Sequence, residues 1–261
     1  LIASTMFLDD IYGLKVWQKL FLQLIAVLIL ISAGIGINTL TNPFGEAINL
    51  NSVYVPLFSY KGIVYNFSLW SDLLTIIWVM GMMNTINFID GVDGLAGGVS
   101  FIALITLFLL SISLAVSQPA TAMIAIILAG STLGFLIWNY TPAKIFMGDS
   151  GSMFLGFMLG ALTLISGGKL ATVFLVLGFP IIDGIAVVIG RIKRGQNPFT
   201  TPDKTHLHHR FLKAGYTPRQ SVLFIYVISI IFSWVALRST TENKIIAAVL
   251  LIIVLFLLTI F

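Results

Sequence analysis

The stretch LWSDLLTIIWVMGMMNTINFIDGVDGLAGG, residues 69–98, holds the two features that decide the fold. Residues 69–88 are mostly apolar, and about 20 such residues are needed for a helix to cross the hydrocarbon core of a bilayer. From residue 84 onward the stretch becomes rich in Asn, Asp and Gly. An apolar segment that ends in such residues predicts a transmembrane helix that delivers a polar site to one membrane surface.

The composition of the whole chain agrees with a membrane protein. Of its 261 residues, 58% are hydrophobic and only 9% are charged, whereas soluble domains carry about 25% charged residues. A water-soluble globule is therefore excluded. The absence of Cys excludes disulfide frameworks, thiolate metal sites and Cys nucleophiles. The net charge is +4, but the basic residues are scattered between apolar runs, so no nucleic-acid partner is expected.

The hydrophobic pattern predicts an all-α polytopic membrane protein with about eight transmembrane helices in one integral membrane domain, residues 1–261. The predicted spans are 17–37, 69–88, 99–117, 120–138, 152–166, 169–190, 220–238 and 245–261. The run Leu1–Leu8 has the character of the last turns of a helix. We therefore expect the chain to be a fragment that lacks upstream helices.

Eight spans divide the connecting segments between two sides. Ten of the 14 Lys and Arg residues fall on the side that holds residues 1–16, 89–98, 139–151 and 191–219, which the positive-inside bias makes cytoplasmic. Seven of the ten acidic residues and all three His residues fall on or near this side. A protein that merely spans the bilayer has no reason for this asymmetry. The long loop at about 38–68 is then extracytoplasmic, and we expect a small hairpin near residues 53–67.

Two polar groups of residues suggest a cation site at the cytoplasmic face. Asp9 and Asp10 are adjacent carboxylates, which repel each other and favour a bound cation, although they also fit a solvated helix end. Asn84, Asn87 and Asp90 recur every three residues and stack on one helix face. Their oxygens suit Mg²⁺, and the glycines at 91, 94, 97 and 98 are expected to break the helix. Helix capping by Asp and Asn and helix–helix contacts through Asn are the alternatives.

Three further segments carry polar residues. Asp149, between Gly148 and the Ser150-Gly151 pair, can present a carboxylate to a metal or act as a helix N-cap, and Phe146 can stack on a base. The loop at about 191–219 carries His206, His208, His209 and Arg210, which can donate to phosphate oxygens; a zinc site and a solvated basic loop are the alternatives. Asp183 lies inside an apolar stretch, so we expect it to face the bundle interior or a polar cavity, and pairing with a helix neighbour or with Arg191 is the alternative.

These segments, in this order, resemble the polyprenyl-phosphate N-acetylhexosamine-1-phosphate transferases. The resemblance covers residues 9 to about 220 and depends on NTINFIDGVDGL (84–95), FMGD (146–149) and PFTTPDKTHLHH (198–209). The last of these looks most like the bacterial branch that transfers GlcNAc-1-phosphate from UDP-GlcNAc to undecaprenyl phosphate, releasing UMP and starting cell-envelope glycans such as O-antigen or teichoic acid.

The resemblance also implies roles for individual residues. Mg²⁺, or Mn²⁺ in its place, would be held by Asn87 and Asp149, and Asp9 and Asp10 would orient or deprotonate the lipid phosphate. The substrate-binding residues would be Asn84, Asp90, Asp93, Phe146, His206, His208, His209 and Arg210, with Phe146 on uracil and the basic group on the diphosphate or sugar. The protein would lie in the bacterial inner (plasma) membrane, tend to form a homodimer, and face the cytoplasm with its active site.

Other functions remain open at this stage. Another UDP-N-acetylhexosamine or UDP-MurNAc-pentapeptide can be the donor, because the motifs do not reveal the contacts that select the sugar. A transporter or lipid carrier is the alternative from a different class, but transporters hold ionisable residues near the bilayer midplane, and here only Asp183 fits that pattern. An inactive scaffold of the same fold is a third alternative.

Overall fold

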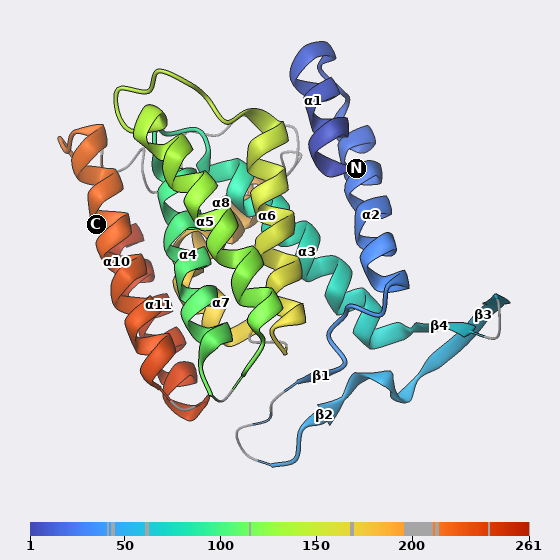
Figure 1. Ribbon diagram of the computed structural model, residues 1–261. Helices are drawn as coiled ribbons and strands as arrows, with labels where there is room; N and C mark the ends of the chain where they lie inside the picture. Colours follow the sequence, from blue (N-terminus) through green and yellow to red (C-terminus); the bar gives the residue numbers. More distant parts are fainter. Residues whose placement is uncertain are drawn as a thin grey trace.

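The computed structural model describes residues 1–40, 42, 45–60, 63–114, 116–167, 170–195, 211, 214–239 and 241–260. Its helices are α1 (Ile2–Tyr12), α2 (Val16–Ser32), α3 (Leu69–Ile89), α4 (Leu95–Ile112), α5 (Pro119–Asn139), α6 (Gly148–Ile165), α7 (Leu170–Val176), α8 (Gly178–Lys193), α10 (Pro218–Arg238) and α11 (Thr241–Ile260). They form a helical bundle with short strands at one end (Figure 1). The strands are β1 (Thr39–Leu40), β2 (Ile48–Asn49), β3 (Tyr54–Tyr60) and β4 (Ile63–Ser68), and η1 (Leu50–Ser52) is a short 3₁₀ turn.

A helix lies at each of the eight predicted spans, but fewer helices meet the requirements for crossing a membrane. Within the described residues, five helices are long and apolar enough, namely α3, α4, α5, α6 and α10. The bent pair of α7 and α8 adds a sixth candidate if the two helices together form one span. The helix α2 has 17 residues and is shorter than these. The chain is therefore a polytopic membrane protein, with five or six candidate spans in place of the eight predicted.

The predicted span over residues 169–190 is not one straight helix. The axes of α7 and α8 differ by 79°, and the break falls at Leu177. Pro180 lies in the first turn of α8, where its missing N–H would have no helical partner in any case. In an uninterrupted helix the same proline would remove a hydrogen bond and clash with the preceding turn. The bend therefore places Pro180 where it costs least.

The bundle is centred on α4. In its most apolar window 67% of the residues are buried, against 28% for α5, and α4 packs against α5, α6, α7 and α10. Large apolar side chains remain exposed on the outer faces of the helices, including Ile77, Ile127, Ile137, Leu223 and Ile230. Such a surface would be a liability in water but suits a hydrocarbon solvent.

Glycines set the distance between α3 and α6. A Cβ atom on Gly156 would lie 2.5 Å from the Cα atom of Met83, and one on Gly160 would lie 3.3 Å from the Cα atom of Val79. Small residues spaced by four allow two membrane helices to approach backbone to backbone. This crossing brings the carboxyl end of α3 to the amino end of α6, where the predicted motifs lie.

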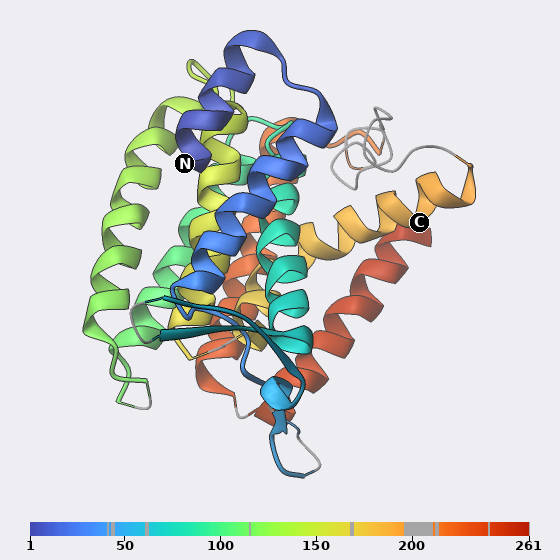
Figure 2. The same cartoon turned by 90° about the vertical axis from the view of Figure 1, so that its right-hand side faces the viewer.

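The predicted hairpin near residues 53–67 is confirmed, since β3 and β4 pair antiparallel from Tyr54↔Ser68 to Tyr60↔Ile63. The backbone N–H of Ser68 donates to Oδ2 of Asp72 at 2.8 Å, which ties the hairpin to the start of α3. A second, shorter pair of strands, β1 and β2, was not predicted. Figures 1 and 2 place the strands at one end of the bundle and the turn between α1 and α2 at the other.

Two predicted helix breakers lie inside a helix. Gly94 is the N-cap of α4, with φ of 79°, but Gly97 and Gly98 belong to α4 itself. Gly98 is needed there because the ring of Tyr226 on α10 packs directly against it, leaving no room for a Cβ atom. The expectation that residues 97 and 98 break the helix is therefore wrong, and close packing explains why glycine occurs there.

Candidate active site

The two adjacent carboxylates have different environments at the end of α1. The helix ends at Tyr12, and Gly13 reverses the chain with φ of 68°. The turn directs the backbone N–H of Leu14 to Oδ1 of Asp9 at 2.6 Å. Asp9 is only 6% exposed, whereas Asp10 is exposed. The alternative for this pair was a solvated helix end. Asp9 is too buried for that description, and only Asp10 is exposed to solvent.

Asp10 caps a helix other than its own. Its carboxylate accepts the backbone N–H of Asp149 at 2.9 Å and of Ser150 at 3.1 Å. These are first-turn donors of α6, which have no partner within the helix and favour a negative group. A Cβ atom on Gly148 would lie 2.8 Å from Asp10 Oδ2, so this approach requires glycine. Asp149 is therefore not the N-cap, because it lies inside the first turn and Asp10 accepts the free N–H groups.

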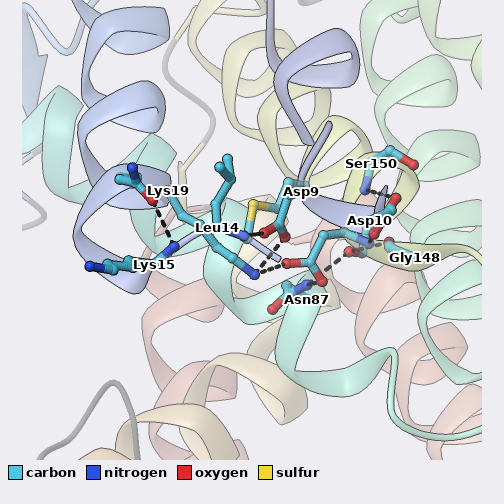
Figure 3. A network of polar contacts seen from close by, with 12 residues as sticks. Asp9, Asp10, Leu14, Lys15, Lys19, Asn87, Gly148 and Ser150 are labelled. Atoms are coloured by element: carbon cyan, nitrogen blue, oxygen red, sulfur yellow. Dashed lines mark hydrogen bonds and ion pairs between the residues drawn. The ribbon is translucent and has the colours of Figure 1, made fainter. Parts of the chain in front are cut away.

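Asp149 is the centre of a polar network, and Figure 3 labels two of its partners, Lys19 and Asn87. Asn87, in the last turn of α3, donates through Nδ2 to Asp149 Oδ1 at 2.8 Å and to Ser152 Oγ at 3.0 Å. Lys19 on α2 donates through Nζ to Asp149 Oδ2 at 2.7 Å, and the same Nζ lies 2.5 Å from Asp9 Oδ2. Four helices thus meet at this carboxylate, and the two predicted metal ligands, Asn87 and Asp149, are in direct contact.

The donor set fits a hard divalent cation. Asp9, Asp10 and Asp149 each offer a carboxylate oxygen, and these oxygens lie within 4.8 Å of one another. Three carboxylates against the single ammonium of Lys19 leave a formal excess of two negative charges in this cluster. Oxygen ligands with net negative charge are what Mg²⁺ and Mn²⁺ prefer. We call Asp9, Asp10 and Asp149 the carboxylate cluster.

A polar cleft opens beside the cluster. It has a volume of about 100 Å³, and it is lined by Lys19, Gln23, Asn84, Asn87 and Asp149 together with apolar side chains. Asn84 donates to Gln23 Oε1 at 2.9 Å and to the carbonyl of Met80 at 2.7 Å. Ligand pockets usually measure about 300–1,000 Å³. The cleft therefore accommodates an ion with a few waters or a phosphate group, and a nucleotide would extend beyond it.

Asp90, the C-cap of α3, has an unusual acidity. Burial, together with the nearby negative charges of Asp149 and Asp10, raises its pKa to about 7. A carboxyl group with a pKa near neutrality is typical of functional sites, although structural networks also produce it. Asp90 thus shares the electrostatic environment of the cluster.

Asp93 holds the loop that follows α5. Its Oδ2 accepts the backbone N–H of Ala143 at 2.9 Å, and its carbonyl accepts the hydroxyl of Thr141 at 3.2 Å. Asn139 joins the same two loops, accepting from the N–H of Gly94 at 3.0 Å and donating to the carbonyl of Ile145 at 2.9 Å. The structure therefore gives Asp93 a partner within the protein, and its predicted contact with substrate remains a prediction.

Two side chains of α10 donate hydrogen bonds to these loops. Tyr226 donates its hydroxyl to the carbonyl of Gly94, and Arg219 donates through Nε to the carbonyl of Thr141 at 2.9 Å. Phe146, in the loop so held, is 79% exposed. Its predicted stacking on uracil is untested, but the ring is accessible to a ligand.

Some of the predicted site residues lie together in the structure, and others are not among the residues that the structure describes. Asp9, Asp10, Asn87 and Asp149 form one network, and Asn84 and Asp90 lie next to it. Asp183 is buried, as expected. The predictions for His206, His208, His209 and Arg210 concern residues outside the described part of the chain.

Two site residues were missed as such in the sequence. From the sequence Lys19 is only one of the basic residues on the cytoplasmic side, and Gln23 has no predicted role. Both lie within a mostly apolar helix at a spacing of four, so they share one face. Polar residues on one face of a membrane helix normally point into the bundle, and that signal could have identified both.

Comparison with known proteins agrees with this site. The model of glycosyl transferase family 4 matches residues 1–167. A probable undecaprenyl-phosphate N-acetylglucosaminyl 1-phosphate transferase of Bacillus subtilis (strain 168) is 36% identical over 243 residues, which is 90% of this chain and 62% of the relative. The decaprenyl-phosphate N-acetylglucosaminephosphotransferase of Mycobacterium tuberculosis (strain ATCC 25618 / H37Rv) is 39% identical over 41% of this chain and 30% of the relative.

A phospho-N-acetylmuramoyl-pentapeptide-transferase of Rickettsia bellii (strain OSU 85-389) is 35% identical over 43% of this chain and 31% of the relative. The chain thus spans at most about three fifths of the length of these relatives. The family model covers the carboxylate cluster, the end of α3 and the loop before α6, which together make up the site described above. By this match the chain belongs to glycosyl transferase family 4.

Proposed function

We propose that the full-length protein transfers N-acetylglucosamine 1-phosphate from UDP-GlcNAc to undecaprenyl phosphate, with release of UMP. The observation that carries the proposal is the convergence of Asp9, Asp10, Asp149 and Asn87 at one end of a membrane bundle. The acceptor and the sugar follow the names of the relatives in Bacillus subtilis and Mycobacterium tuberculosis. The reaction would begin the synthesis of a cell-envelope glycan.

The proposed reaction is a substitution at phosphorus. An oxygen of the lipid phosphate forms a bond to the β-phosphorus of the UDP-sugar, and the bond from that phosphorus to the bridging oxygen breaks. The bridging oxygen leaves with the electron pair as part of UMP, so the product is a lipid diphosphate sugar. Catalysis of such a transfer consists mainly of positioning and neutralising charge.

The residues that would hold the cation are Asp149 and Asn87, with Asp9 and Asp10 beside them. Bound Mg²⁺ or Mn²⁺ would neutralise charge that develops on the diphosphate oxygens. Asp10 is the exposed member of the acidic pair and already orders the start of α6. It is thus the carboxylate that an incoming lipid phosphate would meet, whereas Asp9 is buried against Lys19.

An apolar groove next to the site suits the hydrocarbon part of the acceptor. It has a volume of about 550 Å³ and runs between α3 and α8, lined by Ile76, Ile77, Met80, Ile181, Ile185, Val188 and other apolar residues. The groove shares Leu20, Asn84 and Phe88 with the polar cleft. A polyprenyl chain in this groove would place its phosphate at the carboxylate cluster.

The charge distribution of the sequence supports a cytoplasmic orientation of this end, where UDP-sugars are available. In the full chain the basic loop of His206, His208, His209 and Arg210 would contact the donor diphosphate, Phe146 would stack on uracil, and Asn84, Asp90 and Asp93 would shape the pocket. We place the protein in the bacterial inner membrane as a multi-pass protein. A homodimer fits the tendency of the family.

The test is transfer by the purified full-length protein in detergent. Radiolabelled UDP-GlcNAc and undecaprenyl phosphate should yield a labelled lipid and one UMP per product, and only with Mg²⁺ or Mn²⁺. The Asp149→Asn variant should lose this activity by at least about a hundredfold, a scale typical of removing an electrostatic group. The matched control is Asp72→Asn, a carboxylate at the far end of α3.

Two outcomes would redirect the assignment. Faster transfer from UDP-GalNAc or UDP-MurNAc-pentapeptide would move the protein to another donor within the family. Counterflow of lipid or sugar in proteoliposomes, without any UMP release, would instead favour a transporter. The described site argues against the transporter, because its ionisable groups gather at one end of the helices and not near their middle.

A further inference from the structure

Lys19 occupies the position in the site where a cation is expected. Its Nζ lies 2.5 Å from Asp9 Oδ2 and 2.7 Å from Asp149 Oδ2. The oxygens of these two residues, together with one of Asp10, make up the only group of three or more His, Asp or Glu side chains within the described residues that is arranged to hold a metal. The ammonium group therefore already contacts two of the three carboxylates and offsets one of their three negative charges.

An ammonium and a divalent ion cannot use the same oxygens together. A single and a double positive charge that share the same oxygens repel each other strongly, and Mg²⁺ requires its oxygen ligands at about 2.0–2.1 Å. Lys19 is partly buried, with a side-chain exposure of 24%. Solvent therefore screens this repulsion only in part.

We infer that Lys19 is a resident counter-ion which a divalent cation must displace from Asp9 and Asp149. The inference rests on the proposed function only in taking a divalent cation as a component of the site. In the metal-free protein Lys19 keeps three mutually repelling carboxylates assembled. When the cation binds, the ammonium leaves these oxygens and its electrostatic role passes to the ion.

The cleft provides the space for that exchange. Lys19 lines it together with Gln23 and Asn84, and the flexible four-carbon stem of lysine can turn while its backbone in α2 stays in place. The displaced ammonium remains beside the cluster and faces the space into which an anion would enter. Lys19 is thus a positioning residue for the site, and its position depends on the cation.

The proposed exchange and a simple structural role for Lys19 predict opposite changes in Mn²⁺ affinity. Lys19→Met keeps most of the unbranched side chain but removes the competing charge, so the cluster should bind Mn²⁺ more tightly, by about tenfold, which corresponds to about 1.4 kcal/mol. If Lys19 merely braced the site, the same substitution would loosen the cluster and weaken binding. The Lys19→Arg variant retains the charge and should keep an affinity close to that of the wild type.

The experiment measures free Mn²⁺ by electron paramagnetic resonance during titration of the full-length protein in detergent, without substrate. Lys15→Met is the matched control, because Lys15 is exposed one turn before Lys19 and should leave the affinity unchanged. Thermal unfolding provides a second readout. Lys19→Met should unfold at a lower temperature than the wild type without metal, and saturating Mn²⁺ should remove that difference.

Each result decides the inference. Tighter binding in Lys19→Met with unchanged binding in Lys15→Met supports the exchange. Equal or weaker binding in Lys19→Met overturns it, and so does a wild-type protein that binds no Mn²⁺. Transfer from UDP-GlcNAc is assayed separately on the same preparations. Tighter binding in a protein that transfers no sugar would reject the proposed function and leave the exchange standing.

Discussion

Asn87 on α3 donates its side-chain amide to Asp149 on α6 across 2.8 Å, although the two residues are 62 positions apart in the sequence. The same nitrogen also donates to Ser152. Because the amide nitrogen is used for these contacts, the amide oxygen is the atom of Asn87 that remains for a ligand. The hydrogen bond thus fixes which end of Asn87 can serve as the predicted metal ligand.

The substitution Asn87→Asp should separate the metal-free state from the metal-bound state. It replaces an N–H donor with a fourth carboxylate beside Asp149, so the metal-free protein should lose about 1.5–3 kcal/mol, the usual worth of a hydrogen bond to a charged group. Bound Mg²⁺ should recover much of this loss, because the new carboxylate is also a hard oxygen ligand.

Thermal unfolding with and without Mg²⁺ measures both effects. The gain in melting temperature on adding Mg²⁺ should be larger for Asn87→Asp than for the wild type. The control is Asn84→Asp, which alters the contact with Gln23 one turn earlier. An equal gain in all three proteins would mean that Asn87 does not lie beside the cation.

The crossing of α3 and α6 should depend on Gly156. In Gly156→Ala the new Cβ atom would meet the backbone of Met83 at 2.5 Å, so the helices must separate. Overpacking of this kind typically costs about 1–3 kcal/mol. The separation should also lengthen the Asn87–Asp149 contact and lower transfer activity.

Gly134→Ala on α5 is the matched control for this substitution, because nothing lies within 4 Å of the added Cβ atom. It should be neutral or slightly stabilising, since alanine favours helices over glycine by about 1 kcal/mol. Denaturant or thermal unfolding, together with the transfer assay, compares the two. Equal losses in both variants would show that the distance between α3 and α6 does not control the site.

The sequence alone identified the helices and the main polar residues of the site. Apolar runs of about 20 residues predicted the location of each span, and the spacing of Asn84, Asn87 and Asp90 identified the helix face that meets the cluster. These features are local, so periodicity and composition reveal them. Within the described residues five or six helices qualify as spans, against eight predicted, in part because α2 has only 17 residues and because composition does not show that the segment of α7 and α8 bends by 79°.

Long-range contacts were not predictable in the same way. The capping of α6 by Asp10 joins residues 139 and 140 positions apart, and no local pattern links a carboxylate on one helix to the free N–H groups of another. The roles of Gly98 and Gly156 were hidden for the same reason: their neighbours are on α10 and α3. The sequence predicts Lys19 only as a basic residue at the cytoplasmic end of a span, because its two partners come from α1 and α6.

Stability should fall with rising pH because of Asp90. Its pKa is raised to about 7 in the folded protein, against about 3.9 in an unfolded chain. Between these values the folded state binds more protons than the unfolded state, so the contribution of Asp90 is fully present below about pH 4 and is lost as the pH passes through 7. Asp90→Asn should therefore show a flatter stability profile from pH 5 to 8.

Melting temperatures across this range, measured in chelator, test the Asp90 prediction. The wild type should fall relative to Asp90→Asn as the pH rises, and Mg²⁺ should reduce the difference, because a nearby cation favours the charged carboxylate. The control is Asp93→Asn, whose carboxylate contacts the backbone of Ala143. Parallel profiles for the wild type and Asp90→Asn in chelator would contradict the raised pKa.

The losses of stability from substituting Gly98 and Tyr226 should be non-additive in a double-mutant cycle. Gly98→Ala puts a Cβ atom into the ring of Tyr226, which must move and release the carbonyl of Gly94. Tyr226→Ala removes both the obstacle and the hydrogen bond, so adding Gly98→Ala to it should cost little. We expect a coupling free energy of at least about 1 kcal/mol from unfolding measurements. Additive losses would place the two residues in separate contacts, and α10 would then not be what holds the start of α4 against the active-site loops.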